Sequence, residues 1–289
     1  MAATALRITE LDTALAEAES QVPGLRPGCE KQILWAGEPG AKTATSLLFI
    51  HGFSATGQEL RPLPDMIAGE LGANLFFTRL TGHGQDGPAM AQATLDDWQR
   101  DVAEALEVAG ILGDEVIVMG CSTGCTLATL ALAEGAKARA VFFISPNFGL
   151  RYRVVQWLMD LPGAHRWMRY IAGRTRSFGP INDRHAAYWT TSYPTEAVKQ
   201  MAEAVRAARR AELSQVTVPG LFVFNEADRV VSPDATRAVM ARWGGPVQHL
   251  PVTPGPGDDA MGHIVAGETF SPGQTEPVAR RILAWLTEH

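Results

Sequence analysis

Short runs of apolar residues recur along the chain between segments that mix apolar and polar positions. Unbroken apolar runs of this length suit strands that are buried on both faces, as in a parallel sheet covered by helices. We therefore expect strands of one sheet at residues 46–52, 74–80, 115–120, 139–145 and 220–225. A sixth segment, residues 247–252, also has the composition of a strand and is expected beside them.

The segments between these runs carry helical patterns. Leu95, Trp98 and Val102 recur at three- and four-residue steps, and residues 278–286 near the C-terminus repeat the pattern. Such spacing places one apolar stripe on a helix. Strands that alternate with helices predict an α/β fold, with a mostly parallel open sheet, right-handed crossovers and helices on both faces.

One region interrupts the alternation of strands and helices. Residues 150–212 show no strand pattern, so we expect a helical insertion there, between a first part of the core at 1–149 and a second part at 213–289. An insertion in this place can cover the carboxyl edge of the sheet, where open α/β sheets bind ligands. Its aromatic residues either line a pocket or only pack the insertion onto the body; they are Tyr152, Trp157, Trp167, Tyr170, Tyr188, Trp189 and Tyr193.

Composition narrows the class of protein. The chain of 289 residues is 46% hydrophobic and 19% charged, which is ordinary for a globular protein. Its net charge of -6 argues against a nucleic-acid partner, and no apolar run is long enough to span a membrane. The insertion is basic, with ten Arg and one Lys against five acidic residues, which suits either anionic substrates or solvated helices.

The N-terminus and the cysteines indicate the cellular compartment. The first twenty residues lack a basic start followed by an apolar segment, so we expect no signal peptide. Three cysteines form neither a disulfide framework nor a CxxC pair, which favours a cytoplasmic protein. The sequence contains no indication of an oligomeric state.

A glycine-bracketed turn carries the main chemical signal. Residues 120–124 read Gly-Cys-Ser-Thr-Gly, directly after an expected strand and before an Ala/Leu-rich segment. This is the context of a nucleophile elbow, in which a strained turn lifts the central hydroxyl above the sheet at a helix N-terminus. We therefore expect Ser122 to be a nucleophile and interpret Cys121 and Cys125 as small packing residues.

A serine nucleophile needs a base that an acid orients, and in elbow-bearing folds these follow in the order Ser, acid, His. Glu226 and Asp228 both follow the expected strand at 220–225. A helix start at Ser232 and Pro233 leaves Asp228 on the loop itself, so we favour Asp228. His263 lies in a Gly/Pro-rich loop between the last strand and the C-terminal helix, where the base should arrive.

The turn after the first apolar run is expected to supply part of the oxyanion hole. Residues 51–53 read His-Gly-Phe and end a strand at the same edge as the elbow. The backbone N–H groups of Phe53 and Thr123 are expected to form an oxyanion hole. Gly52 permits a close approach, and His51 is interpreted as structural.

With these motifs in place, the chain resembles the α/β-hydrolase fold, in particular its lid-bearing bacterial carboxylesterases and monoacylglycerol lipases. Beyond the elbow, acid and histidine, the resemblance rests on "HGFSATGQELRPL" (51–63), "RLTGHGQDG" (79–87) and "DDW" (96–98). It covers roughly residue 30 to the end. It implies hydrolysis of a small-molecule ester through an acyl-enzyme, without a metal or organic cofactor, and it gives residues 150–212 the position of the lid.

Other residue patterns in the chain suggest competing functions. Residues 82–87 form a G-x-G-x-x-G, the dinucleotide fingerprint, but Pro88 and the run to Thr94 are expected to separate it from any helix. Asp258 and Asp259 with His263 could suggest a metal site, although adjacent Asp side chains point apart. Amide or peptide hydrolysis by the same three residues, and a non-catalytic small-molecule receptor, stay open as alternatives. An epoxide- or haloalkane-cleaving enzyme would carry Asp in place of Ser122.

Overall fold

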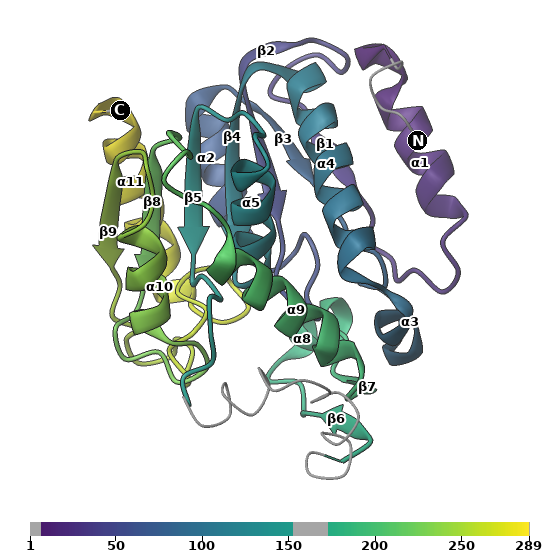
Figure 1. Ribbon diagram of the computed structural model, residues 1–289. Coiled ribbons are helices and arrows are strands. Elements are labelled where there is room, and N and C mark those ends of the chain that lie inside the picture. The colour runs from purple at the N-terminus through teal and green to yellow at the C-terminus, as the bar shows by residue number, and fades with distance from the viewer. Residues whose placement is uncertain (1–6, 153–172, 289) are drawn as a thin grey trace.

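A seven-stranded sheet forms the centre of the molecule, in the order β1-β3-β2-β4-β5-β8-β9 (Figure 1). The computed structural model describes residues 7–152 and 173–288. Among these seven strands of the described chain, only β1 runs antiparallel to its neighbour, so the predicted mostly parallel sheet is confirmed. The strands are β1 (Gln32–Leu34), β2 (Thr43–Ile50), β3 (Asn74–Phe77), β4 (Gly113–Cys121), β5 (Ala140–Ile144), β8 (Gly220–Phe224) and β9 (Val247–Pro251).

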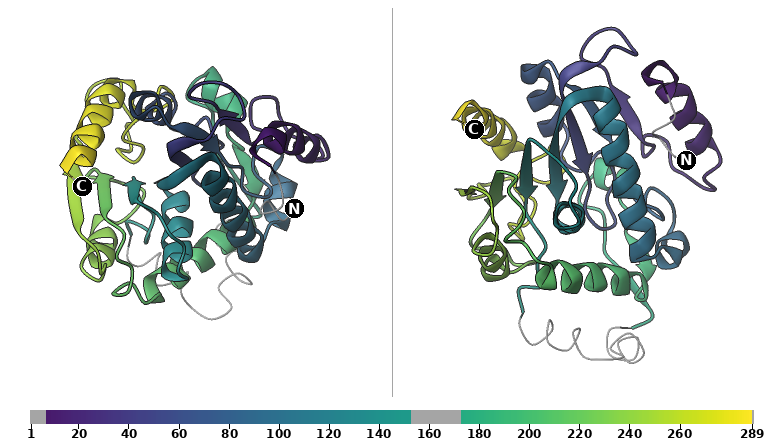
Figure 2. Two further views of the ribbon diagram at one scale, coloured as in Figure 1. Left: turned by 90° about the horizontal axis from the view of Figure 1, so that it is seen from above. Right: turned by 45° about the horizontal axis from the view of Figure 1, so that its top comes forward.

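Helices cover both faces of this sheet (Figure 1; Figure 2). They are α2 (Leu63–Leu71), α4 (Leu95–Leu112), α5 (Thr123–Ala133), α10 (Pro233–Met240) and α11 (Pro272–Glu288). Phe143 points to the face of α4, α5 and α10, while its neighbour Phe142 points to the face of α2 and α11. Successive side chains of a strand alternate between faces, so continuous apolar strands can feed two separate cores. Both phenylalanines are fully buried, as the sequence pattern predicted.

The N-terminal segment, which the resemblance does not cover, packs on the outside of the α4 face. It forms a short 3-10 helix, η2 (Ile8–Glu10), and then α1 (Leu11–Ser20), whose Leu11 and Leu15 are buried. Glu19 at the end of α1 accepts hydrogen bonds from Arg79 Nε at 2.6 Å and Nη2 at 2.8 Å. The backbone N–H of Lys31 also donates to Glu19, at 3.0 Å. A buried, paired charge thus ties the first segment to the loop that follows β3.

The described part of the expected insertion lies at the carboxyl edge of the sheet, below the arrowhead of β5 in Figure 1. The sequence pattern predicted no strands here, and this was wrong: β6 and β7 pair as an antiparallel hairpin. Strands of three residues are too short to show an alternating pattern. Trp157, Trp167 and Tyr170 lie outside the described residues. The elements are β6 (Thr175–Ser177), α8 (Asp183–Tyr188), β7 (Ser192–Pro194) and α9 (Ala197–Arg210).

The glycine-rich loop at 82–87 differs from its expectation in one respect. A short helix, α3 (Gly87–Gln92), begins at the last glycine, so the expected separation from a helix was wrong. Its N-terminus is occupied, because the Asp86 carboxylate caps it by accepting from Ala89 N–H at 3.0 Å. A Cβ on Gly87 would stand 2.3 Å from the carbonyl oxygen of Ser192. A carboxylate and the β7 backbone therefore fill the place that a pyrophosphate would need.

Over residues 7–152 and 173–288, none of the helices combines the length and the apolar character needed to cross a membrane.

Candidate active site

Ser122 stands between β4 and α5, at the carboxyl edge of the sheet. Its backbone has φ of 48° and ψ of -110°, a region that residues other than glycine rarely adopt. The strain is held by hydrogen bonds on both sides: Ser122 N–H donates to Ile144 O at 3.0 Å, and Asn147 N–H donates to Ser122 O at 3.2 Å. The strained turn predicted from the sequence is therefore present.

The two glycines of the turn allow β2, β4 and α5 to approach closely. A Cβ on Gly124 would stand 2.0 Å from the carbonyl oxygen of Ile50, at the end of β2. A Cβ on Gly120 would stand 2.7 Å from the backbone nitrogen of Cys125. No side chain fits either contact, which explains why the pattern brackets the serine with glycine.

The neighbouring thiols pack against the sheet. Cys121 and Cys125 are fully buried, and Cys125 Sγ donates to Gly120 O at 3.1 Å. Burial raises the pKa of both thiols well above its usual value. A thiolate is the nucleophilic form of cysteine, so both side chains are held in the unreactive state.

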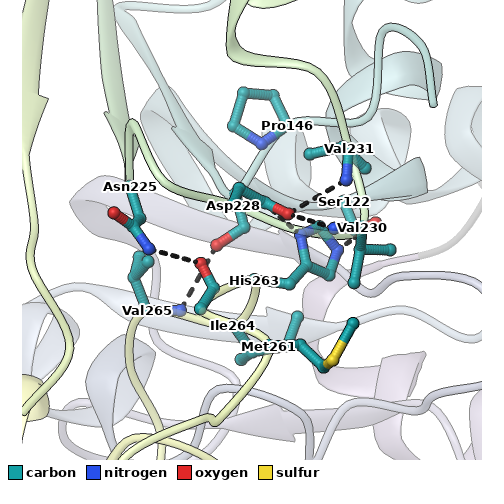
Figure 3. Close-up of polar contacts among 12 residues, drawn as sticks. Ser122, Pro146, Asn225, Asp228, Val230, Val231, Met261, His263, Ile264 and Val265 are labelled. Carbon is teal, nitrogen blue, oxygen red and sulfur yellow. Dashed lines mark hydrogen bonds and ion pairs between the residues drawn. The ribbon is translucent and has the colours of Figure 1, made fainter. Parts of the chain in front are cut away.

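Ser122, His263 and Asp228 come together from three separate segments (Figure 3). His263 Nε2 lies 3.1 Å from Ser122 Oγ, and His263 Nδ1 lies 2.7 Å from Asp228 Oδ2. An ionised carboxylate only accepts hydrogen bonds, so Nδ1 carries the hydrogen and Nε2 is left as the acceptor that faces the serine.

Of the two acids that the sequence offered, only Asp228 reaches the histidine. Asp228 is buried, and its Oδ1 accepts from the N–H groups of Val230 at 2.7 Å and Val231 at 2.9 Å. Glu226 is half exposed, pairs with Arg237 and lies 3.6 Å from His249 Nδ1. The Ser232 cap on α10 is also present, and it accepts from Ala235 N–H at 3.3 Å.

The loop that presents His263 is held by a second aspartate, Asp259, which the sequence pattern suggested only as a metal ligand. Asp259 accepts from the backbone N–H groups of Met261 at 2.9 Å, His263 at 2.8 Å and Ile264 at 3.0 Å. Asn225 Nδ2 also donates to Gly262 O, at 3.0 Å. An aspartate four residues before the histidine in a glycine-rich loop is the sequence signal from which this role could have been predicted.

The same loop accounts for the other candidate metal ligand. Asp258 accepts from the backbone N–H groups of Gly255 at 2.7 Å and Gly273 at 3.0 Å. No group of three or more His, Cys, Asp or Glu side chains suited to a metal ion occurs in the part of the chain that the structure describes.

Charges around His263 favour its protonated form. Burial alone lowers the pKa of this imidazole, but the charge and hydrogen bond of Asp228 oppose it, together with the charges of Asp259 and Glu59. Burial and these charges together raise the pKa of His263 above its ordinary value of 6.5. The site thus stabilises an imidazolium, which is the form that a general base takes on.

The turn after β2 lies directly against the serine. A Cβ on Gly52 would stand 3.2 Å from Ser122 Cβ. His51 is fully buried; its Nδ1 donates to Gly52 O at 2.9 Å and its Nε2 accepts from Leu80 N–H at 3.1 Å. Burial lowers the pKa of His51, so the ring stays neutral and serves the structural role expected for it.

The two backbone donors of the expected oxyanion hole flank this contact. Within the described chain, neither Phe53 N–H nor Thr123 N–H donates a hydrogen bond. Thr123 is the first residue of α5, where N–H groups lack partners within the helix. The Phe53 ring is fixed edge-on against Tyr193 at 5.3 Å and His83 at 5.8 Å between ring centroids.

Comparison with known proteins identifies the family. The sequence matches the alpha/beta hydrolase family over residues 47–269. A thermostable monoacylglycerol lipase from Bacillus sp. (strain H-257) is 28% identical over 194 residues, which cover 65% of this chain and 72% of that protein.

Solved structures of low sequence identity share the fold. One, described under LipS and LipT, two metagenome-derived lipolytic enzymes, has a TM-score of 0.72 at 20% identity and covers 92% of this chain and 100% of its own. The monoacylglycerol lipase of Paleococcus ferrophilus has a TM-score of 0.59 at 13% identity, with 90% and 99% covered.

Proposed function

The chain belongs to the alpha/beta hydrolase family, and on that premise we propose that it is a serine hydrolase that cleaves carboxylic esters. One observation carries the proposal: His263 bridges Ser122 Oγ at 3.1 Å and Asp228 Oδ2 at 2.7 Å. A hydroxyl, a base and a buried carboxylate in this order are the groups that acyl transfer requires.

In the first half of the proposed reaction, Ser122 Oγ attacks the ester carbonyl carbon while His263 Nε2 takes the hydroxyl proton. The carbonyl oxygen becomes an oxyanion and accepts from the N–H groups of Phe53 and Thr123. When the bond to the leaving oxygen breaks, His263 returns the proton to that oxygen. An alcohol departs, and the acyl group stays on Ser122.

In the second half, water replaces the alcohol. His263 Nε2 takes a proton from water, whose oxygen attacks the acyl carbon and forms a second oxyanion in the same place. Collapse releases the carboxylic acid and returns the proton to Ser122 Oγ. Asp228 holds the imidazole and stabilises its charged form throughout.

An ester with an apolar acyl group is the substrate class that we propose. Exposed apolar side chains border His263 in Figure 3: Val230 is 39% exposed and Met261 47%. The relatives named above are lipases and lipolytic enzymes. We further propose that residues 150–212 serve as the lid over this edge, and that the enzyme works in the cytoplasm, where its buried thiols stay reduced.

The test is labelling by a fluorophosphonate probe with peptide mapping, on the wild type and on Ser122→Ala. Hydrolysis of aryl esters of graded acyl length is measured alongside. We expect the probe to mark Ser122 in the wild type only, with ester turnover that Ser122→Ala abolishes. The acyl length of the best ester then sizes the pocket.

Each other outcome points to a stated alternative. Labelling at Ser122 without ester turnover would favour amide or peptide hydrolysis, since both reactions share the tetrahedral oxyanion. A folded wild type without labelling or turnover would favour a non-catalytic receptor. A label on Cys121 would overturn the assignment of the nucleophile.

A further inference from the structure

A buried carboxyl group that the proposed mechanism does not use lies behind the site. Glu59 comes from the loop between β2 and α2 and is 2% exposed. The titratable groups that act on it are Cys121 at the end of β4 and His263 on the loop after β9. A carboxyl group rarely occupies such a place without a specific partner, because burial penalises it.

The partner of Glu59 is the backbone of the oxyanion turn. Gly52 N–H donates to Glu59 Oε2 at 2.6 Å. A Cβ on Gly52 would stand 2.8 Å from Glu59 Oε1 and 3.2 Å from Ser122 Cβ. The carboxyl group and the serine therefore lie against the same small residue, and only glycine fits between them.

This hydrogen bond fixes one end of a short stretch of backbone whose other end is fixed as well. Gly52 O accepts from His51 Nδ1 at 2.9 Å and from Ala55 N–H at 3.3 Å. The Gly52–Phe53 peptide is trans, and a trans peptide directs its carbonyl and its N–H in opposite directions. Holding Gly52 N–H and Gly52 O thus sets the direction of Phe53 N–H, the expected oxyanion donor.

The backbone of Glu59 is itself tied to the loop that carries the base. Glu59 N–H donates to Thr56 O at 3.0 Å, and Glu268 N–H donates to Arg61 O at 3.0 Å. A Cβ on Gly267 would stand 2.8 Å from Glu59 O, so the two loops are in close contact. The backbone that carries the carboxyl group is held on both sides, so the carboxyl group can act as a fixed support.

Glu59 also titrates in the range where an esterase is assayed. Burial raises its pKa to about 7, against the opposing effects of Gly52 N–H, the Cys121 thiol and the charge of His263. Both the ionised and the neutral carboxyl group retain an oxygen that accepts from Gly52 N–H. The ionised form in addition favours protonation of His263.

From this geometry we propose that Glu59 is a positioning residue for the oxyanion hole: through Gly52 N–H it holds the Gly52–Phe53 peptide so that Phe53 N–H meets the developing oxyanion. The proposal rests on the proposed hydrolase function. It assigns to this carboxyl group a role in binding the transition state, whereas a filler of the fold would affect only stability.

Two variants separate the roles. Glu59→Gln keeps an acceptor for Gly52 N–H and removes the charge, whereas Glu59→Leu removes the acceptor. Because oxyanion contacts form in the transition state, we expect Glu59→Leu to lower kcat by about 10- to 100-fold while KM changes by less than about 3-fold. Glu59→Gln should restore kcat to within about 3-fold of the wild type, because the amide oxygen replaces the carboxyl oxygen.

The pH profile gives an independent readout. Removing the charge of Glu59 takes away one of the groups that raise the pKa of His263. A base must be deprotonated to act, so the acidic limb of kcat/KM should move to lower pH in Glu59→Gln. An unmoved limb would contradict the placement of the Glu59 carboxyl group beside the site.

Asn74→Leu is the matched control. Asn74 is likewise buried and accepts from a backbone N–H, that of Ala36 at 3.0 Å, but it stands at the start of β3, at the edge of the sheet opposite the site. It should lower the thermal midpoint without changing kcat. Fluorophosphonate labelling rates on all variants, with the thermal midpoint of each, complete the experiment.

The outcomes separate the role proposed for Glu59 from the hydrolase function on which it rests. A wild type that labels at Ser122, with Glu59→Leu folded and equally fast in labelling and in kcat, would overturn the role of Glu59 alone. Equal losses in Glu59→Gln and Glu59→Leu would overturn it too, since the acceptor would then be irrelevant. A wild type without labelling or turnover would overturn the hydrolase function, and this role with it.

Discussion

At the scale of single residues, the site depends on side chains that hold other groups in place. Asp228 uses one oxygen for His263 and the other for the N–H groups of Val230 and Val231. Asp259 holds the backbone on either side of the histidine. The ring of His263 is therefore fixed through its own hydrogen bond and through its main chain.

Replacing Asp228 with Asn tests the proposed acid. The amide is nearly the same size, so the fold should persist, but it can stabilise the wrong tautomer of His263 and cannot stabilise an imidazolium. We expect kcat to fall about 10³- to 10⁴-fold, as for other triads of this kind. Glu226→Gln, on the neighbouring acid, should turn over like the wild type, and the reverse ranking would move the acid to Glu226.

The charges around His263 predict the acidic side of the pH profile. The pKa of His263 is raised above 6.5, and only the neutral ring can accept the serine proton. Activity should therefore be present at pH values above the raised pKa and be lost as pH falls through it. A plot of kcat/KM against pH should place the acidic midpoint above 6.5 in the wild type and lower in Asp259→Asn, which loses one of the charges. A wild-type midpoint at or below 6.5 would contradict this reading.

At the scale of elements, the site depends on how closely β2 and α5 approach each other. The helix starts one residue after Ser122, and its first turn touches the carbonyl groups at the end of β2 through Gly124. This contact brings the N-terminus of α5 next to the Gly52 turn. The two expected oxyanion donors thus come from two elements whose spacing is set by one glycine.

Gly124→Ala tests that contact. The added Cβ would stand 2.0 Å from Ile50 O, so strand and helix must separate. Overpacking of this kind costs about 1–3 kcal/mol, which urea denaturation would measure, and turnover should fall as well. Gly110→Ala in α4 is the control, because nothing lies within 4 Å of its Cβ, and it should stabilise by about 0.5–1 kcal/mol. Equal midpoints for the two variants would remove the special status of Gly124.

The sequence predicted the elements with strong patterns and missed those without them. The runs at 46–52, 115–120 and 220–225 became central strands, since they are apolar on both faces. The hairpin of β6 and β7 was missed because each strand has only three residues, and most of them are exposed. Ser122, Asp228 and His263, which the structure brings together, were predicted from motif and order. Glu59 was not, because a hydrogen bond to Gly52 depends on how the loop folds back.

At the scale of the whole molecule, the N-terminal segment is part of the fold even though the resemblance begins near residue 30. Its helix α1 adds Leu11 and Leu15 to the core that α4 and α5 share. Its last turn carries Glu19, whose carboxylate pairs with Arg79, both of them buried. The segment is thereby connected to the loop that follows β3.

Glu19→Leu tests this connection. The variant leaves the guanidinium of Arg79 buried without its partner, and breaking a buried pair in this way costs about 3–5 kcal/mol. Urea denaturation should show the loss as a lower midpoint. The exposed pair of Arg7 and Glu10 supplies the control, and Glu10→Gln should leave the midpoint unchanged. A Glu19→Leu midpoint equal to that of Glu10→Gln would show that the segment is not coupled to the core.

Because the cysteines are buried, the rate at which each is alkylated measures how often the folded molecule opens around it. Cys29, Cys121 and Cys125 are the three cysteines of the chain, and none is more than 1% exposed. Alkylation by iodoacetamide must therefore wait for a local fluctuation, and mass spectrometry of the peptides can time it. Cys29 reports on the N-terminal segment, and Cys121 on the turn that carries the serine. The order in which they are alkylated would show which of the two regions opens first.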